Sequence, residues 1–189
     1  MICMKLQKLL NHHALNPEIF CNDKALLFLY PMIKKTGFTV ELATKKLEHY
    51  CAYQDRCHKE VVAKLKSMGM IPIAIDTIMA HLIANRFLNE ERFAKSFARG
   101  KFKIKKWGKN RIVRELKARE ISRFNIQTAL KEISDADYYE TFDRLAQKKV
   151  DQITETNPLK AKKKLVDYLL YRGWEPQMVY EKAAEFYSF

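Results

Sequence analysis

The chain of 189 residues is rich in helix-forming residues and poor in the residues that punctuate β-structure. It contains only 5 Gly and 5 Pro, fewer than an all-β fold with many tight turns requires. Its 35 Lys and Arg against 22 Asp and Glu give a formal net charge of +13. The composition therefore favours an all-α protein with a negatively charged partner, either nucleic acid or an acidic protein surface.

The cysteines do not form the dense framework of a small secreted fold, and the first residues do not show the pattern of a signal peptide. We therefore expect a reduced, cytoplasmic protein. Cys51, Cys57 and His58 lack a standard zinc spacing, so we interpret the thiols as free and expect no metal and no cofactor. The longest apolar runs have about eight residues, far short of the ~20 that span a bilayer, and no membrane association is expected.

Residues 1–38 form a poorly patterned N-terminal extension. Their only regular apolar stretch, Ala25–Tyr30, has no convincing partner helix in the same segment. We expect residues 1–31 to have low order, and the patterned part of the chain to begin at about residue 39.

From there onward, a unit of about 50 residues occurs three times. Leu65, Leu116 and Leu169 align at spacings of 51 and 53 residues, and the residues four and three positions before each of them are apolar in every copy. These neighbours are Val61 and Val62, Ile112 and Val113, and Leu165 and Val166. The agreement predicts a second helix of each repeat that buries the same face around an anchor leucine.

Signals for the end of this helix and the start of the next follow each anchor. Gly69 and Gly173 lie four residues after it, where glycine is typical of a helix C-terminus, whereas Glu120 puts the local turn of the middle copy in question. Pro72 and Pro176 lie seven residues after it and suit the first turn of a new helix. A further helix is predicted before each anchor, at Leu42–Tyr53, Glu90–Arg99, with Asn89 as its N-cap, and Tyr138–Ile153.

We therefore predict an all-α fold of three tandem three-helix repeats in an elongated, curved array, with helix-turn-helix-like units. The segments are the extension 1–38 and the repeats 39–88, 89–137 and 138–189. A unit of this size holds little core by itself, so neighbouring units must pack on one another. A single irregular bundle with an accidental register is the alternative.

The central copy resembles the middle repeat of RecX-type regulatory proteins. That family has an acidic cap, Arg-Phe-Ala, a basic loop, Gly, Ile-xxx-Leu and a closing Gly-Ile, and the resemblance covers about residue 40 to the end. The matching residues are Glu90, Glu91, Arg92, Phe93, Ala94, Gly108, Ile112 and Leu116. The flanking copies match more loosely, through Arg56, Glu60, Leu65 and Gly69, and through Lys164, Leu165, Tyr168, Leu169, Arg172 and Gly173. Glu120 departs from the family glycine.

The resemblance implies a monomeric regulator without enzymatic activity. It would bind RecA recombinase and its filament on single-stranded DNA, and modulate, mainly inhibit, recombinase, ATPase and co-protease activity in DNA repair and the SOS response. The sequence has no Gly-rich phosphate loop and no nucleophile motif, which agrees with a non-enzyme. The alternative is a protein that binds DNA directly, with weak sequence dependence, through helix-turn-helix-like units.

The stretch from Arg92 to Arg123 holds 13 basic and two acidic residues, a net charge of +11. We interpret Lys101–Lys109 as the connection between the first two helices of the middle repeat. Contact with the RecA filament, independent DNA binding and a merely solvated face stay open for it, and core packing is favoured for Phe102 and Trp107. The candidate contact residues are Arg92, Arg99, Lys101, Lys103, Lys105, Lys106, Trp107, Lys109, Arg111 and Arg114.

Overall fold

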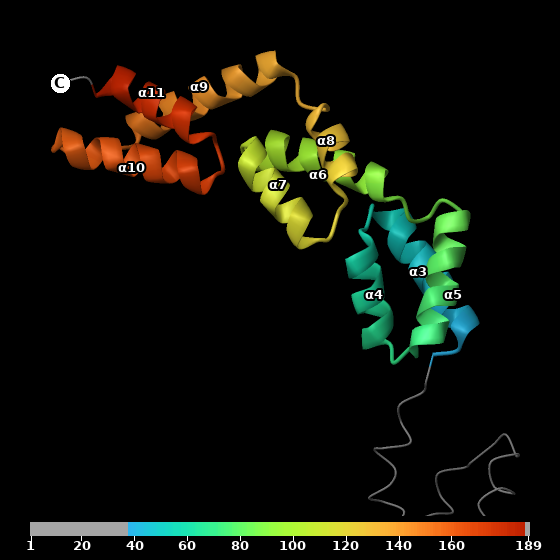
Figure 1. Cartoon of the computed structure of the whole chain (residues 1–189). Helices are drawn as coiled ribbons and strands as arrows, with labels where there is room; N and C mark the ends of the chain where they lie inside the picture. The colour runs from blue at the N-terminus through green and yellow to red at the C-terminus, as the bar shows by residue number, and fades with distance from the viewer. Residues whose placement is uncertain (1–37, 188–189) are drawn as a thin grey trace, which may run out of the picture. The chain divides into compact units, whose positions relative to one another are not determined.

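The computed structural model describes residues 38–187. Residues 1–31, for which we predicted low order, lie outside this range. The described residues form nine α-helices and no strand, so the predicted all-α class is confirmed. The helices follow one another in three groups of three, which we call the first, second and third modules (Figure 1). They are α3 (Val40–Tyr53), α4 (His58–Ser67) and α5 (Pro72–Ala84); α6 (Glu90–Lys105), α7 (Lys109–Ala118) and α8 (Arg123–Leu130); and α9 (Asp135–Asp151), α10 (Pro158–Tyr171) and α11 (Pro176–Phe186).

Most helices begin where a polar side chain can satisfy their first amide groups. The Asn89 side chain accepts the N–H of Arg92 at 2.8 Å, which confirms Asn89 as the N-cap of α6. Ser134 caps α9 in the same way, so this helix begins at Asp135, three residues before the predicted Tyr138. Prolines open α5 and α11 as predicted. The division of the chain at residues 89 and 138 stays a prediction.

The second helix of every module ends in the same turn. Gly69, Glu120 and Gly173 all have a left-handed backbone, with φ of 78°, 61° and 86°. The N–H of the following residue donates to the anchor leucine's carbonyl each time, at 3.2, 3.2 and 3.3 Å. The glutamate in the middle copy therefore leaves the turn unchanged. It takes a conformation that costs an L-amino acid more than glycine.

Our interpretation of Lys101–Lys109 as a connection is wrong for most of its length. α6 continues through Lys105, and only residues 106–108 link it to α7. The helix continues because Phe102 extends the buried stripe of Ala94 and Ala98 at a spacing of four residues. It ends at Lys106, which adopts a left-handed φ of 53°.

The buried apolar residues of the described chain form two clusters. One belongs to the first module and includes Leu65, and the other runs through the second and third modules and includes Leu116 and Leu169. All three anchor leucines have an exposed fraction of 0%, which confirms that they occupy equivalent core positions. Cys57 stands at the start of α4 but packs into the second cluster, so it links the first module to its neighbour.

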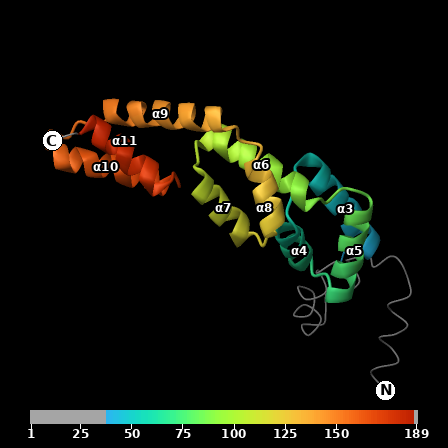
Figure 2. The same ribbon diagram turned by 45° about the horizontal axis from the view of Figure 1, so that its top comes forward.

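Neighbouring modules meet through corresponding elements. The Gly108 N–H at the start of α7 donates to the Arg172 carbonyl at the end of α10, at 3.0 Å. At the other junction, Lys59 near the start of α4 donates through Nζ to the Ala118 carbonyl at the end of α7, at 3.1 Å. Each second helix thus directs its N-terminus at the last turn of the next one. Figure 2 shows α7 between α4 and α10.

Candidate partner-binding surface

The basic residues predicted as partner contacts come from α6, α7 and their connection, and several are already engaged within the fold. Arg92, in the first turn of α6, donates from Nε to Asp55 at 2.7 Å, and from its two Nη atoms to the carbonyls of Arg86 and Phe87 at 3.0 and 3.1 Å. The guanidinium therefore joins the connection between α3 and α4 to the connection between α5 and α6.

Arg99 and Lys109 are held by acidic residues of later elements. Arg99 donates to Glu132 at 3.3 Å, beyond the end of α8. The ammonium of Lys109 lies 3.0 Å from Asp135 on α9 and 4.5 Å from the centre of the Tyr138 ring. Both cations therefore hold α6 and α7 against the segment that leads into the third module.

Arg111 lies between two aromatic rings at the junction of the second and third modules. Its guanidinium carbon is 4.2 Å from the ring centre of Trp107 and 4.6 Å from that of Tyr171, and its Nη1 donates to the Tyr171 carbonyl at 2.9 Å. Such a stack combines cation–π attraction with a hydrogen bond to the end of α10. Arg111 therefore fastens the two modules together.

The aromatic residues of the basic stretch pack inward. Phe102 is buried and its ring centre lies 5.9 Å from that of Tyr138, which confirms its predicted core role. Trp107 is half-buried and packs against the same cluster, edge-on to Phe97. Lys101 places its ammonium 5.3 Å from the Trp107 ring centre. Phe97 and Trp107 thus have cationic partners within the chain and Phe102 is buried, so none of the three rings is an open platform for a stacked base.

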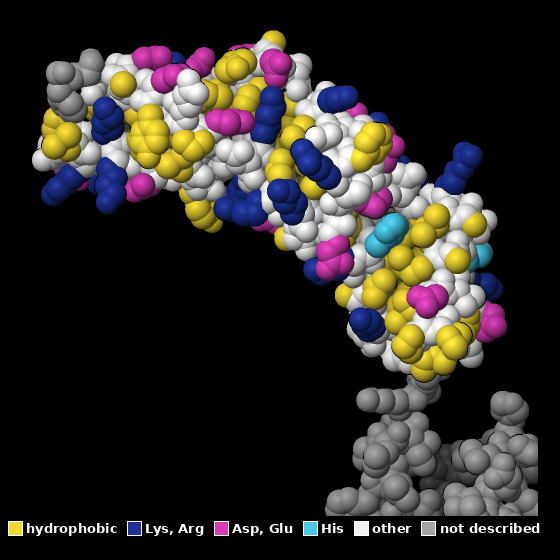
Figure 3. Space-filling view, in the orientation of Figure 1, with side chains coloured by type: hydrophobic (Ala, Val, Ile, Leu, Met, Phe, Trp, Pro, Cys, Tyr) yellow, Lys and Arg dark blue, Asp and Glu magenta, His cyan; other side chains and the backbone are white. Residues whose placement is uncertain are grey.

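Four predicted contact residues differ from these. Among the residues that the structure describes, the side chains of Lys103, Lys105, Lys106 and Arg114 make no hydrogen bond, salt bridge or cation–π contact. All are exposed except Lys106, which is half-exposed. We call these four residues the open cations. Figure 3 shows Lys and Arg side chains gathered over α7 and its junction with the third module, whereas hydrophobic side chains dominate the visible face of the first module.

Two further exposed cations without partners among the described residues were not among the predicted contacts. Lys117 and Arg123 are exposed and lack such contacts with the described residues. Lys117 follows Arg114 by three positions on α7, so the two side chains share one face of the helix. This spacing was a signal in the sequence that would have added Lys117 to the candidate contacts.

The two cysteines within the described residues, Cys51 and Cys57, are buried free thiols, as predicted. Burial raises the pKa of both, which lowers their reactivity at neutral pH. In residues 38–187 no group of three or more His, Cys, Asp or Glu side chains is placed to hold a metal ion. None of the helices described is long and apolar enough to cross a membrane.

Comparison with protein families identifies two of the modules. Residues 89–130 match the family model described as RecX, second three-helix domain. Residues 135–182 match the model described as RecX, third three-helix domain. The matches follow each other in chain order, as the repeat in the sequence requires.

Curated relatives from several bacteria carry one name. The regulatory protein RecX of Serratia proteamaculans is 31% identical over 126 residues, which cover 65% of this chain and 73% of the relative. That of Lactobacillus johnsonii is 26% identical over 129 residues, which cover 68% of this chain and 48% of the relative. The chain thus spans about half the length of this relative and of the one from Listeria welshimeri, where the share is 54%.

Solved structures share the fold. A crystal structure of regulatory protein RecX matches with a TM-score of 0.68 and 20% identity, over 86% of this chain and 78% of that one. The crystal structure of RecX from Lactobacillus salivarius matches with a TM-score of 0.66 and 23% identity, over 77% of this chain and 95% of that one. The resemblance that the motifs indicated is confirmed: on its family models and its Serratia relative, this chain belongs to the RecX family of regulatory proteins.

Proposed function

We propose that this chain is a regulatory protein that binds RecA and its filament on single-stranded DNA and modulates, mainly inhibits, recombinase, ATPase and co-protease activity in DNA repair and the SOS response. Its family consists of regulatory proteins, which supports a regulatory role. The proposal includes a cytoplasmic monomer without enzymatic activity and without a cofactor. Several small modules suit a polymeric partner, because linked weak contacts gain strength from effective concentration.

The observation that carries the proposal is the difference between open and engaged cations. A side chain such as Arg92 or Arg111 must give up hydrogen bonds inside the protein before it can serve a partner, and an open cation gives up only water. We therefore propose that Lys103, Lys105, Lys106 and Arg114 make the contact, together with Lys117. The engaged residues Arg92, Arg99, Lys101, Trp107, Lys109 and Arg111 would position this surface.

The test reverses the four open cations to glutamate in one variant. We expect the concentration needed to inhibit ATP hydrolysis by RecA filaments to rise by about tenfold or more, because each reversed charge replaces attraction with repulsion at the contact. Co-sedimentation with the filaments should fall in parallel. Unchanged inhibition would remove these residues from the mechanism.

A matched control reverses four exposed lysines elsewhere and changes the net charge by the same amount. Lys45, Lys64, Lys66 and Lys131 are exposed, and none forms a side-chain hydrogen bond or salt bridge with a described residue. This variant should inhibit RecA as the natural chain does. A loss equal to that of the first variant would show that only the overall charge of the protein matters.

Direct DNA binding remains the second candidate, because the same open cations are free to contact phosphates. Affinity for single-stranded DNA, measured with and without RecA over a salt series, separates the two functions. Binding through phosphates alone weakens steeply as salt rises and does not depend on RecA. We expect RecA to increase the affinity. If RecA adds nothing at any salt concentration, direct DNA binding is the better description.

A further inference from the structure

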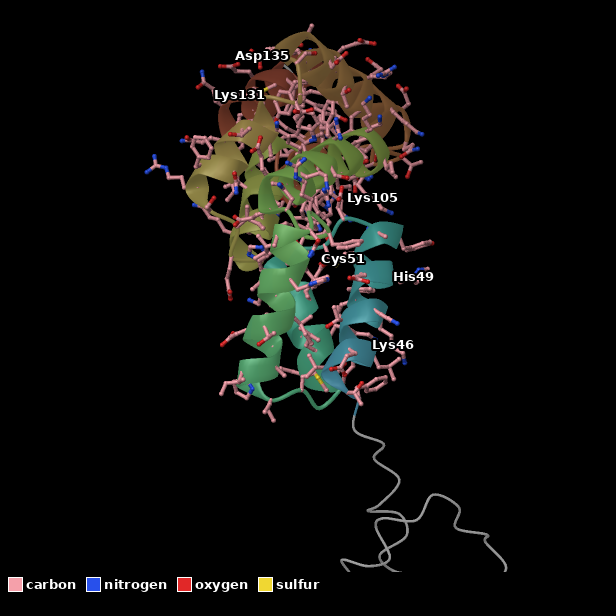
Figure 4. The ribbon with its side chains drawn as sticks, turned by 90° about the vertical axis from the view of Figure 1, so that its right-hand side faces the viewer. Lys46, His49, Cys51, Lys105, Lys131 and Asp135 are labelled. Carbon is pink, nitrogen blue, oxygen red and sulfur yellow. The ribbon has the colours of Figure 1, made fainter. Side chains whose placement is uncertain are left out.

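A hollow of about 380 Å³ opens on one side of α6, where this helix faces the connection between α3 and α4. One side of α6 lines it with residues at helical spacing, among them Phe97, Gly100, Ile104 and Lys105. Arg56, from the connection, lines the opposite side. In Figure 4, the labelled Lys105 lies beside the end of α3, as expected for a residue that lines the groove together with the connection after α3. We call this hollow the α6 groove.

The α6 side of the groove is an apolar strip that runs from the half-buried Phe97 to the exposed Ile104. Ile104 is 76% exposed although it is a large aliphatic residue in the middle of a charged segment. A Cβ atom built on Gly100 would meet nothing within 4 Å, so this position is a gap between Phe97 and Ile104. Covering such a strip removes apolar surface from water, which favours the binding of an apolar side chain.

The charges around the strip are unbalanced toward positive. The two carboxylates of the lining are already paired, Asp55 with Arg92 at 2.7 Å and Glu60 with Arg119 at 3.8 Å. The cations Arg56, Lys101 and Lys105 have no carboxylate partner among the described residues.

Of these cations, Arg56 lies on the side of the groove opposite α6. Its guanidinium lies 4.2 Å from the ring centre of Tyr50, and its Nε is buried without a hydrogen-bond partner among the described residues. A carboxylate can pair with this guanidinium through its Nη groups, which donate to no described residue. The electrostatics of the groove thus complement a ligand with carboxylates, while its strip complements an apolar side chain.

We propose that the α6 groove binds an acidic peptide segment of a partner protein. One apolar side chain of the segment lies over Gly100 between Phe97 and Ile104, and its flanking carboxylates pair with Arg56, Lys101 and Lys105. A nucleic acid fits less well, because a sugar-phosphate chain leaves the exposed Ile104 uncovered. The proposal goes beyond the regulatory function above, since it assigns a ligand class to the α6 groove, which shares only Lys105 with the open cations, whatever the partner is.

Gly100 provides the sharpest test, because it can be filled without harm to the helix. Replacing this glycine in the interior of α6 with alanine or leucine improves helix propensity. Gly100→Leu places a bulky side chain in the groove, and Gly100→Ala adds only a methyl group. The probe is a fluorescein-labelled peptide with one central phenylalanine flanked by aspartate and glutamate, and binding to the full chain is followed by fluorescence anisotropy.

We expect the peptide to bind the natural chain, and Gly100→Leu to weaken that binding by about tenfold or more. Gly100→Ala should bind within about twofold of the natural chain, and Arg56→Gln should weaken binding while circular dichroism shows an intact fold. The same peptide with serine in place of phenylalanine should bind more weakly.

Three results would overturn the proposal. They are equal binding by Gly100→Leu and the natural chain, no preference for the peptide with phenylalanine over the one with serine, and displacement of the peptide by oligothymidylate with the same sensitivity to Gly100→Leu. The last result would make the groove a nucleic-acid site. None of these results depends on RecA, so the failure of the proposed regulatory function would leave this proposal to be decided by its own measurements.

Discussion

Gly108 and Gly173 touch through their backbones at the junction of the second and third modules, so closely that a side chain on either would overlap the main chain of the other module. The contact lets the Gly108 N–H donate to the Arg172 carbonyl at 3.0 Å and the Asn110 N–H donate to the Gly173 carbonyl at 3.1 Å. The unpaired amides at the start of α7 and the unpaired carbonyls at the end of α10 thus satisfy one another. The junction depends on two residues that have no side chain.

Substitution of Gly108 by alanine should destabilise the protein. The added methyl group would overlap the carbonyl of Gly173, and separating the backbones to make room would lengthen the hydrogen bonds between α7 and α10. We expect the free energy of unfolding to fall by about 1–3 kcal/mol. Urea unfolding followed by circular dichroism measures this change.

The control for this substitution is Gly100→Ala. This glycine lies within α6, and a methyl group there would meet nothing within 4 Å. Alanine should therefore raise the free energy of unfolding by about 0.5–1 kcal/mol. If both alanine variants shifted the urea midpoint in the same direction, close packing at Gly108 would not be the cause.

The left-handed turn after each anchor leucine predicts opposite effects at two equivalent positions. Gly69→Ala introduces a Cβ atom where φ is 78° and nothing lies within 4 Å, so backbone strain alone should lower the free energy of unfolding by about 1 kcal/mol. Glu120→Gly removes that strain at a φ of 61°, and should raise the free energy of unfolding by up to about 1 kcal/mol.

The glutamate also contributes an ion pair, which the second substitution removes. Lys59 lies 2.8 Å from the Glu120 carboxylate, but both side chains are largely exposed, so the pair contributes little. Glu120→Ala keeps the strain and loses the pair, and should leave the stability nearly unchanged. A loss in Glu120→Gly as large as that in Gly69→Ala would show that the ion pair outweighs the backbone strain.

Tyr138 should make the stability of the protein depend on pH only in alkaline solution. Its hydroxyl is buried, donates to Glu175 at 2.7 Å and accepts the N–H of Lys109 at 2.9 Å. Burial first, and then the hydrogen bond to the Glu175 carboxylate, raise the pKa of Tyr138 well above its usual value of about 10. The folded chain keeps this proton at a pH where the unfolded chain has lost it.

The sign of the effect follows from this difference. The stabilisation from Tyr138 is fully present below about pH 10 and is lost as the pH rises further, because only the unfolded state releases the proton. Tyr138→Phe should lower the free energy of unfolding by about 1–3 kcal/mol at neutral pH, since the Lys109 N–H and the Glu175 carboxylate lose a partner. The gap between the natural chain and the variant should narrow above about pH 10 in denaturant titrations. A gap of constant width would contradict the raised pKa.

The repeat and its turns could be predicted from sequence because they depend on short-range patterns. The anchor leucines, the glycines after them and the prolines that open the next helix all act within one or two helical turns. The roles of the cations could not be predicted in this way. Arg92 donates a hydrogen bond to Asp55, 37 residues away in the sequence, and Arg111 donates one to the Tyr171 carbonyl, 60 residues away. No local sequence pattern indicates such distant partners. The predicted end of α6, at Arg99, was too early. The lysines around Phe102 made this segment look like a basic loop, although Phe102 continues the buried face of the helix.

Two substitutions on α6 should separate residues that build the surface from residues that contact the partner. Arg92→Ala removes a guanidinium that makes three hydrogen bonds to the connections around it, and since the side chain is half-exposed we expect a loss of about 1 kcal/mol of unfolding free energy. Lys103→Ala should change the stability by less than about 0.5 kcal/mol. Lys103→Ala should nevertheless weaken the inhibition of RecA at every temperature.

A stabilising second substitution completes this comparison. Where Arg92→Ala inhibits RecA less because part of it is unfolded, the added Gly100→Ala should restore both the stability and the inhibition, because the arginine acts through the fold. The same addition should not rescue Lys103→Ala, since the missing charge belongs to the contact itself. If Arg92→Ala stayed inactive after its stability was restored, Arg92 would contact the partner directly, and the division between engaged and open cations would no longer identify the binding surface.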